Sequence, residues 1–411
     1  MTKNAAQEVR RRLVFYVPGY DPFHPRRYRE LYRKEGADQA AIGGYRLSLH
    51  RGENNGAHGW VVTAEIGGEA VTTDFEVLVW SDIVRRSMSD GIVATYLQLI
   101  RTAWIYIRSG AIFRLVRLRK GPAIAALYPI AMLLAQLGLA VAAGLVVRSV
   151  LDRLLARAVV EPAISSWLAG VAGIGVAAAL LSWFRARDKW FYAYYLMHDY
   201  AFTAQNWGAN PPVLEERIRQ FRDRIEAALE GGWDEVLVVG HSSGAHLAIS
   251  VLADLIRRAE PGRVDRVGFL SLGHVVPMAS FLPAARRLRG DLALLSAQDD
   301  ITWIDVTAPG DGCAYALCDP VAVTGVATEE SRWPLVISAA FTQTLSPARW
   351  RELRWRFFRL HFQYLCAFDR PGDYDYFQIT AGPSSLRTRF RDRQPSKSRI
   401  VTALNRYRDV A

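Results

Sequence analysis

Cysteine is scarce in this chain: there are three, Cys313, Cys318 and Cys366, among 411 residues. An odd number this small excludes the disulfide framework of small secreted domains, so we expect a protein of a reducing compartment. No further His or Cys pair joins Cys313 and Cys318 to complete the four ligands of a structural zinc site. We therefore predict no metal and no cofactor.

The N-terminus lacks the apolar stretch of a secretory signal, although residues 1–12 are basic. Acidic residues are also few: 40 Asp and Glu face 51 Lys and Arg, which gives a formal net charge of +11. Such an excess favours an anionic partner. The basic residues gather near two apolar segments and at the C-terminus, without a nucleic-acid-binding motif. The expected partner is therefore a lipid bilayer, and no nucleic acid is expected.

The two apolar segments, residues 121–147 and 162–184, contain no charged residue. Each exceeds the roughly 20 residues that cross a bilayer, so we predict a multi-pass membrane protein with two spans. Small residues recur at four-residue spacing, which favours close helix packing in lipid: Gly138 with Ala142, and Ala169 with Gly173 and Ala177. The alternative is a long apolar helix pair buried in a soluble domain. Positive charge is more abundant outside this hairpin than in its loop at 148–161, which predicts that both termini are cytoplasmic.

The rest of the chain combines short strands with helices. Residues 45–66 alternate between apolar and polar and are interrupted at 52–56, which is typical of a β-hairpin. Continuous apolar runs predict buried strands at 13–17, 75–80, 235–239, 267–272 and 302–306. Helical patterns occur at about 25–35, 212–230 and 245–259. Strands that alternate with helices predict an α/β fold with a mostly parallel sheet. Residues 384–411 are polar and arginine-rich, and are predicted to be a basic tail.

The strongest motif is Gly240-His241-Ser242-Ser243-Gly244, which lies between a predicted strand and a predicted helix. Gly-x-Ser-x-Gly alone is a weak signal, because a chain of this length matches it by chance about one time in seven. The strand-turn-helix setting raises its value, since a sharp turn there would expose the Ser242 hydroxyl beside a helix N-terminus. We therefore expect Ser242 to be a nucleophile.

With this motif the chain resembles the α/β-hydrolase family from about residue 11 to residue 382, apart from the apolar hairpin. Family members often carry His-Gly after an early strand, whereas this chain has Pro18-Gly19-Tyr20-Asp21. The resemblance implies an oxyanion hole made by the backbone N–H groups of Tyr20 and Ser243. Because these donors belong to the main chain, the oxyanion hole does not require the histidine that proline replaces here. By itself, Pro-Gly-Tyr-Asp would be an ordinary turn.

The family's triad runs Ser, then Asp or Glu, then His along the chain, and this order selects the base. Only His361 follows every plausible acid, and His274 is its main competitor. His361 lies in a helical pattern, so it could instead be an ordinary polar residue of an amphipathic helix. For the acid we favour Asp311, just after a predicted strand and a turn. Asp305 and Asp319 remain alternatives.

The resemblance implies a hydrolase domain in two parts, residues 1–105 and 191–383, with a transmembrane hairpin inserted at 106–190 and the tail at 384–411. We expect a membrane-anchored serine hydrolase, with its catalytic domain in the cytoplasm, that cleaves lipid or acyl esters through an acyl-enzyme on Ser242. An acyl-thioesterase or acyltransferase would use the same triad. A non-catalytic, hydrolase-like membrane scaffold is the third possibility.

Overall fold

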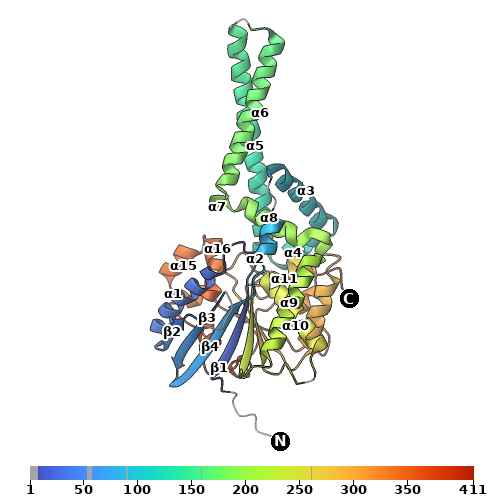
Figure 1. Ribbon diagram of the computed structural model, residues 1–411. Coiled ribbons are helices and arrows are strands. Elements are labelled where there is room, and N and C mark those ends of the chain that lie inside the picture. The colour runs from blue at the N-terminus through green and yellow to red at the C-terminus, as the bar shows by residue number, and fades with distance from the viewer. Residues whose placement is uncertain (1–7, 53–57, 89–90, 159, 261) are drawn as a thin grey trace. The chain divides into compact units, whose positions relative to one another are not determined.

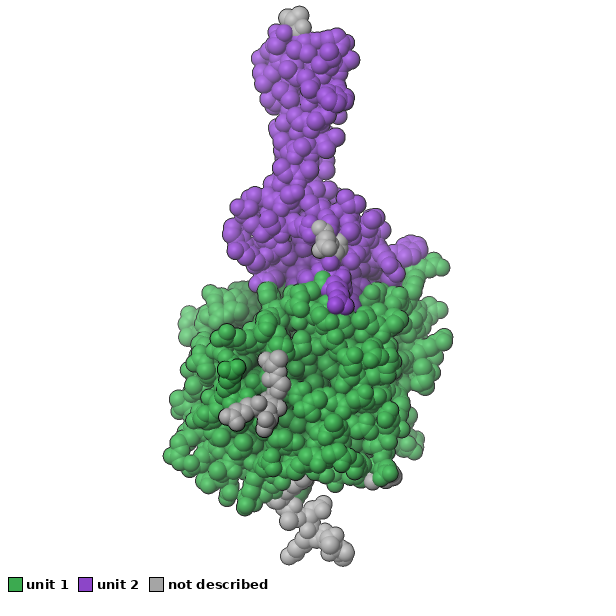
Figure 2. Space-filling model, in the orientation of Figure 1, with its two compact units in different colours: residues 1–85, 107–122, 205–411 green, residues 86–106, 123–204 purple. Residues whose placement is uncertain are grey.

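The computed structural model describes residues 8–52, 58–88, 91–158, 160–260 and 262–411. The chain forms two compact units, which Figure 2 colours separately. Unit 1 comprises residues 1–85, 107–122 and 205–411, and unit 2 comprises residues 86–106 and 123–204. Two segments, 86–106 and 123–204, therefore leave and re-enter unit 1, whereas the sequence predicted a single insertion at 106–190.

Unit 1 contains an eight-stranded sheet in the order β2-β3-β4-β1-β5-β6-β7-β8 (Figure 1). The strands are β1 (Arg11–Val17), β2 (Arg46–His50), β3 (Gly59–Ile66), β4 (Glu69–Val77), β5 (Glu235–His241), β6 (Val267–Leu272), β7 (Thr302–Thr307) and β8 (Leu335–Ser338). The pairs from β4 through β1 to β8 are parallel, while β3 pairs antiparallel with β2 and β4. The predicted α/β class with a mostly parallel sheet is confirmed.

The strands differ from the sequence predictions at two places, β4 and β8. Only residues 75–77 of the run at 75–80 belong to a strand, and residues 78–80 lie beyond its end. The strand is β4, which begins earlier, at Glu69, because it pairs with β3 along nearly its whole length. The predicted hairpin is β2 and β3, but residues 53–57 of its connection lie outside the described part of the chain. β8 was not predicted, since its four residues are too few to show a pattern.

Helices cover both faces of this sheet (Figure 1). The helices of unit 1 with at least five residues are α1 (Arg26–Gly43), α2 (Ser81–Ser87), α4 (Ala111–Leu118), α9 (Pro212–Ala228), α10 (Gly244–Arg258), α11 (Val276–Ser280), α12 (Arg286–Ala297), α13 (Pro320–Thr324), α15 (Pro347–Leu353), α16 (Phe357–His361) and α17 (Tyr376–Ala381). Side chains of α1 and α17, including Tyr32 and Phe377, pack with Val14 and Leu237 in one large core cluster. Helix α10 lies against β5 and between α9 and α12.

In the middle of the sheet, the connections that follow the neighbouring strands β1 and β5 go to opposite sides. After β1 the chain crosses to β2 at one edge of the sheet and returns inward through β3 and β4, whereas after β5, the parallel neighbour of β1, it runs outward in the other direction to β6, β7 and β8. Loops at the carboxyl ends of two such strands diverge and leave a crevice, where α/β proteins bind ligands. Residues 18–21 follow β1 and residues 242–243 follow β5. Both sequence motifs therefore lie at this point of the fold.

Residues 384–411 are not a free tail, because they pack on unit 1. The Arg12 guanidinium donates to the carbonyl oxygens of Gly382 and Ser384, at 2.8 Å each. Ile400 forms a β-bridge with Cys318. The prediction of a tail followed from the polar composition, which conceals that arginines of this segment pair with carboxylates, such as Arg393 with Asp373 at 2.6 Å.

Unit 2 holds two helices that are long and apolar enough to cross a membrane, α5 (Lys120–Arg157, whose first three residues belong to unit 1) and α6 (Pro162–Ala186). The other helices of this region are α3 (Ile92–Arg108), α7 (Asp188–Phe191) and α8 (Ala193–Ala204). Most apolar side chains of α5 and α6 are exposed, among them Leu139 and Ile174. They are therefore not core helices of unit 2, because soluble proteins rarely expose so much contiguous apolar surface.

Glycines bring α5 and α6 close together. A Cβ on Gly144 would lie 2.5 Å from the carbonyl oxygen of Gly173, and a Cβ on Gly173 would lie 2.6 Å from that of Gly144. Gly173 and Ala177, predicted as packing residues, are at this contact, whereas a Cβ on Gly138 would meet nothing within 4 Å. Helix α5 also continues to Arg157 instead of ending near residue 147, because charged residues do not interrupt a helix.

Candidate active site

Ser242 occupies a strained turn between β5 and α10. Its φ is +58°, a left-handed value that residues with a side chain rarely adopt. The Ser242 N–H donates to the carbonyl oxygen of Leu272 at 2.9 Å, which fixes the turn against β6. Ser242 itself is half-buried, while the residues on either side of it are buried. The turn thus presents one serine side chain at the crevice, as the sequence motif predicts.

Both glycines of the motif are required by close approach of the backbone. A Cβ on Gly240 would lie 2.7 Å from Cα of Ala245, so it would prevent the chain from folding back over β5. A Cβ on Gly244 would lie 2.2 Å from the carbonyl oxygen of Val17, at the end of β1. The first glycine therefore permits the turn, and the second lets α10 start directly beside β1.

Asp311 and His361 form a buried pair, although 50 residues separate them. The Nδ1–H of His361 donates to Oδ2 of Asp311 at 2.7 Å. The Tyr364 hydroxyl donates to the same oxygen at 3.0 Å, and the Cys313 N–H donates to Oδ1 at 2.9 Å. Burial alone would raise the pKa of Asp311, but the adjacent His361 and these hydrogen bonds lower it below the ordinary value. An ionised Asp311 fixes the tautomer in which Nε2 of His361 is free to accept a proton.

His361 lies beside the Ser242 turn. His361 is the last residue of α16, so it lies at a helix end rather than in a helix interior. The His361 carbonyl oxygen accepts a hydrogen bond from Nε2 of His241 at 3.0 Å. A Cβ on Gly273 would lie 3.2 Å from Cε1 of His361, and Gly273 follows Leu272, the acceptor for the Ser242 N–H. Among the described contacts, the Ser242 hydroxyl makes no hydrogen bond to His361. Such bonds are often long without substrate and shorten when it binds.

The competing residues have other roles. Both ring nitrogens of His274 are engaged: Nδ1 accepts from the Val276 N–H at 3.3 Å, and Nε2 donates to the carbonyl oxygen of Cys318 at 3.0 Å. Asp305 accepts from the Ser271 hydroxyl at 2.6 Å, and burial raises the pKa of this carboxyl to about 6. Asp319 caps α13 by accepting from two backbone N–H groups. Neither carboxylate is bonded to His361.

The two predicted oxyanion donors are brought together, but only one of them is free. The Ser243 N–H has no acceptor among the described residues, whereas the Tyr20 N–H donates to Oγ of Ser243 at 2.7 Å. A Cβ on Gly19 would lie 3.0 Å from Cβ of Ser242, so the loop after β1 lies directly against the serine. The Ser243 hydroxyl therefore occupies a donor that an oxyanion would need. Sequence reasoning missed this bond, for which the motif gives no signal.

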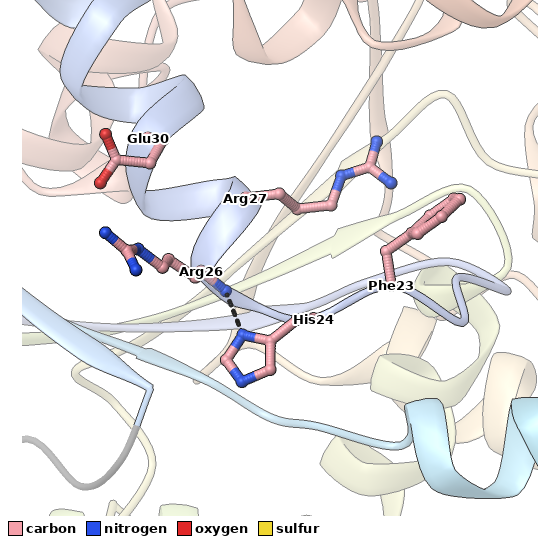
Figure 3. Close-up of a pocket in the computed structure, with 5 residues that line it drawn as sticks. All are labelled: Phe23, His24, Arg26, Arg27 and Glu30. Atoms are coloured by element: carbon pink, nitrogen blue, oxygen red, sulfur yellow. Dashed lines mark hydrogen bonds between the residues drawn. The ribbon is translucent and has the colours of Figure 1, made fainter.

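An open pocket of about 710 Å³ lies next to this loop, lined by Phe23, His24, Arg26, Arg27 and Glu30 (Figure 3). The Arg26 N–H donates to Nδ1 of His24, and the side chains of Arg27 and Phe23 extend to the same side. The Arg27 guanidinium lies 3.0 Å from Asp21 and 5.1 Å from the ring centre of Phe362, the residue after His361. A substrate bound here would meet the Phe23 ring and the charged side chains of Arg26, Arg27 and Glu30.

Cys313 is a further neighbour of the acid-base pair. One ligand atom each of Asp311, Cys313 and His361 lie within 4.8 Å of one another, which makes them the one group among the described residues that could hold a metal ion. The sequence shows no His or Cys pair that would complete a ligand set with Cys313, and the fold instead brings one carboxylate and one histidine to it. In the structure both oxygens of Asp311 already accept hydrogen bonds from protein donors, which fits an Asp–His pair directly.

Tyr364 offers a test of the electrostatics at Asp311. We expect Tyr364→Phe to raise the pKa of Asp311, because the hydroxyl that donates to the carboxylate is lost. An acid with a lowered pKa stabilises the fold above its unfolded pKa, and that stability is lost as the pH falls through the folded pKa. The midpoint of acid unfolding should therefore move to higher pH. Circular dichroism during acid titration measures it.

Tyr32→Phe is the matched control, since it removes a buried hydroxyl that bonds to Thr380 at 2.9 Å and not to Asp311. This variant should lose stability by about 1 kcal/mol at all pH values. An equal shift of the acid midpoint in both variants would contradict the role of Tyr364.

Comparison with known proteins assigns this chain to no family. No protein-family model, no curated protein and no solved structure matches this chain. The chemistry of the site accordingly follows from its own geometry: a strained serine, a buried Asp–His pair and backbone donors at the crevice of an α/β sheet.

Proposed function

We propose that this protein is a membrane-anchored serine hydrolase of the α/β-hydrolase type, which cleaves carboxylic esters through an acyl-enzyme on Ser242. The observation that carries the proposal is the buried Asp311–His361 pair at 2.7 Å beside the strained Ser242 turn. The chain order Ser, Asp, His and the strand-turn-helix setting of the serine both agree with this type of enzyme.

Each group has a defined part in the proposed reaction. Nε2 of His361 removes the hydroxyl proton of Ser242 while Oγ attacks the ester carbonyl carbon. The resulting oxyanion accepts hydrogen bonds from backbone N–H groups at Ser243 and Tyr20. Protonated His361 then gives its proton to the departing alcohol, and the acyl group remains on Ser242. Water, deprotonated by His361, releases the carboxylic acid and restores the serine.

The membrane location in this proposal rests on α5 and α6. Their length, their exposed apolar side chains and their close contact at Gly144 and Gly173 suit a helix pair in lipid. The excess of Lys and Arg outside the pair favours a cytoplasmic catalytic unit and cytoplasmic termini. An enzyme held at a bilayer meets esters that partition there, so we assign it lipid or long-chain acyl esters.

The test is labelling of the full chain in membranes with a fluorophosphonate probe, which modifies activated serines. Mass spectrometry of the labelled peptides should place the probe on Ser242. A probe on another serine, or none at all, would overturn the proposal, and the latter would favour a non-catalytic scaffold. Long-chain ester and thioester substrates then separate an esterase from a thioesterase or acyltransferase, and a preference for short water-soluble esters would contradict a bilayer substrate.

A further inference from the structure

The segment just before the catalytic base combines positive charge with exposed aromatic rings. Residues 349–359, which we call the basic aromatic segment, span most of α15 and the start of α16. This segment contains one acidic residue, Glu352, and five arginines: Arg349, Arg351, Arg354, Arg356 and Arg359. Two of its large apolar side chains are exposed, Trp355 by 71% and Phe357 by 51%.

The single carboxylate cannot neutralise this charge. Glu352 is shared by Arg349, Arg356 and Arg359, at 2.9, 3.4 and 3.3 Å. The other two arginines have no carboxylate partner among the described residues. The Arg351 side chain donates to a backbone carbonyl at 3.2 Å, and the Arg354 guanidinium lies 5.5 Å from the ring centre of Trp355. A net positive surface therefore surrounds the two exposed rings, and its complement is an anionic surface with an apolar interior.

Contacts within unit 1 connect this surface to the start of the first apolar helix. A Cβ on Gly312, next to Asp311, would lie 3.5 Å from the Phe357 ring. A Cβ on Gly121, the second residue of α5, would lie 3.6 Å from Cα of Gly312. Phe357, the acid loop and the first turn of α5 are thus consecutive neighbours. The basic aromatic segment therefore lies next to the first turn of the helix that we propose to enter the bilayer.

Helix α4, just before α5, also combines arginines with an exposed aromatic ring. Leu115 and Leu118 are buried, whereas Phe113 is 67% exposed, so the helix has a large apolar side chain on its exposed face. Arg114 and Arg117 lie on the same short helix, and Arg119 and Lys120 follow it. Exposed rings with interspersed arginines are typical of helices that lie in the membrane interface.

We propose that the basic aromatic segment binds the anionic headgroups of the membrane and inserts Trp355 and Phe357 beneath them. This inference rests on the proposed membrane location. It adds to the proposed function that the segment leading to His361 contacts an anionic leaflet, in which the esters assigned to the enzyme are dissolved. The partner is a lipid surface; a protein that covers the same rings is the alternative outcome.

Hydrogen–deuterium exchange of the full chain in nanodiscs tests this proposal. One nanodisc contains only phosphatidylcholine, and the other contains phosphatidylcholine with one third phosphatidylglycerol. We expect amide exchange in peptides that cover 354–361 to slow by on the order of tenfold in the anionic nanodisc. Arg354→Gln with Arg356→Gln, and separately Trp355→Ala with Phe357→Ala, should remove this difference, because both pairs of side chains are exposed.

The control is Arg219→Gln with Arg263→Gln, which removes two exposed, ion-paired arginines elsewhere on unit 1. This variant should keep the slow exchange. Equal exchange in the two nanodiscs, or protection only in native membranes, would overturn the proposal, and the second result would indicate a protein partner. Because exchange does not depend on catalysis, a failure here is distinct from a failure to label Ser242.

Discussion

Replacing Ser242 with alanine is expected to lower ester hydrolysis by at least about a thousandfold, and by up to about a millionfold, as removal of a catalytic serine does in known serine hydrolases. The substitution deletes the atom that forms the covalent bond, so the probe label on residue 242 should disappear as well. The fold should be unaffected, because alanine and serine meet similar strain at φ of +58°. Initial rates on a long-chain ester and the melting temperature measure the two effects.

Ser48→Ala is a suitable control, since Ser48 lies on β2, a strand at the edge of the sheet. This variant should retain both hydrolysis and labelling. Hydrolysis that survives in Ser242→Ala at the level of this control would refute the acyl-enzyme on Ser242.

Asp311→Asn is expected to have the second largest effect, a fall in kcat/KM of about ten thousandfold. Asparagine has nearly the same shape as aspartate, so the fold should remain. It cannot stabilise a protonated His361, and its amide N–H favours the tautomer whose Nε2 already carries a proton. Single-turnover kinetics with an activated ester should locate the loss in acylation.

The same substitution at Asp305 provides the contrast. Asp305 is also fully buried beside a histidine, with 3.6 Å between its Oδ2 and Nε2 of His274. Burial raises the pKa of Asp305 to about 6, so the surroundings stabilise its charge poorly and the uncharged amide of asparagine should be tolerated there. Asp305→Asn should therefore keep its activity. If it lost activity while Asp311→Asn kept it, the acid and the base would have to be reassigned to Asp305 and His274.

Much of the fold could be predicted because its signals are local. The strands β5, β6 and β7 are continuous apolar runs bounded by turns, and such runs indicate a buried parallel sheet. Contacts between distant residues were not predictable. The C-terminal segment is held by backbone bonds to Arg12 and Cys318, and nothing in its polar composition indicates them.

In the candidate site too, the residue with a local sequence signal could be predicted directly, and the residues that depend on distant contacts could not. Ser242 could be identified from the glycines around it, since each prevents a specific clash. Asp311 and His361 could be selected only by chain order and position, and the sequence left their competitors open. Tyr364, which bonds to Asp311, was missed because a tyrosine three residues after a histidine is not a recognisable motif. Side-chain hydrogen bonds between distant segments depend on the tertiary fold and so cannot be read from spacing.

The hydrogen bond from the Tyr20 N–H to the Ser243 hydroxyl would help the site to distinguish a neutral ester carbonyl from a tetrahedral oxyanion. An ester carbonyl is a neutral acceptor, like the hydroxyl that it would have to displace, so the exchange gains little free energy when substrate first binds. A tetrahedral oxyanion carries a full charge and attracts the same N–H far more strongly. In the proposed reaction the Ser243 hydroxyl would thus be a competing acceptor that only the charged intermediate can displace. Part of the stabilisation would be withheld from the bound substrate and would become available as the bond to Ser242 forms, which would lower the barrier rather than tighten ground-state binding.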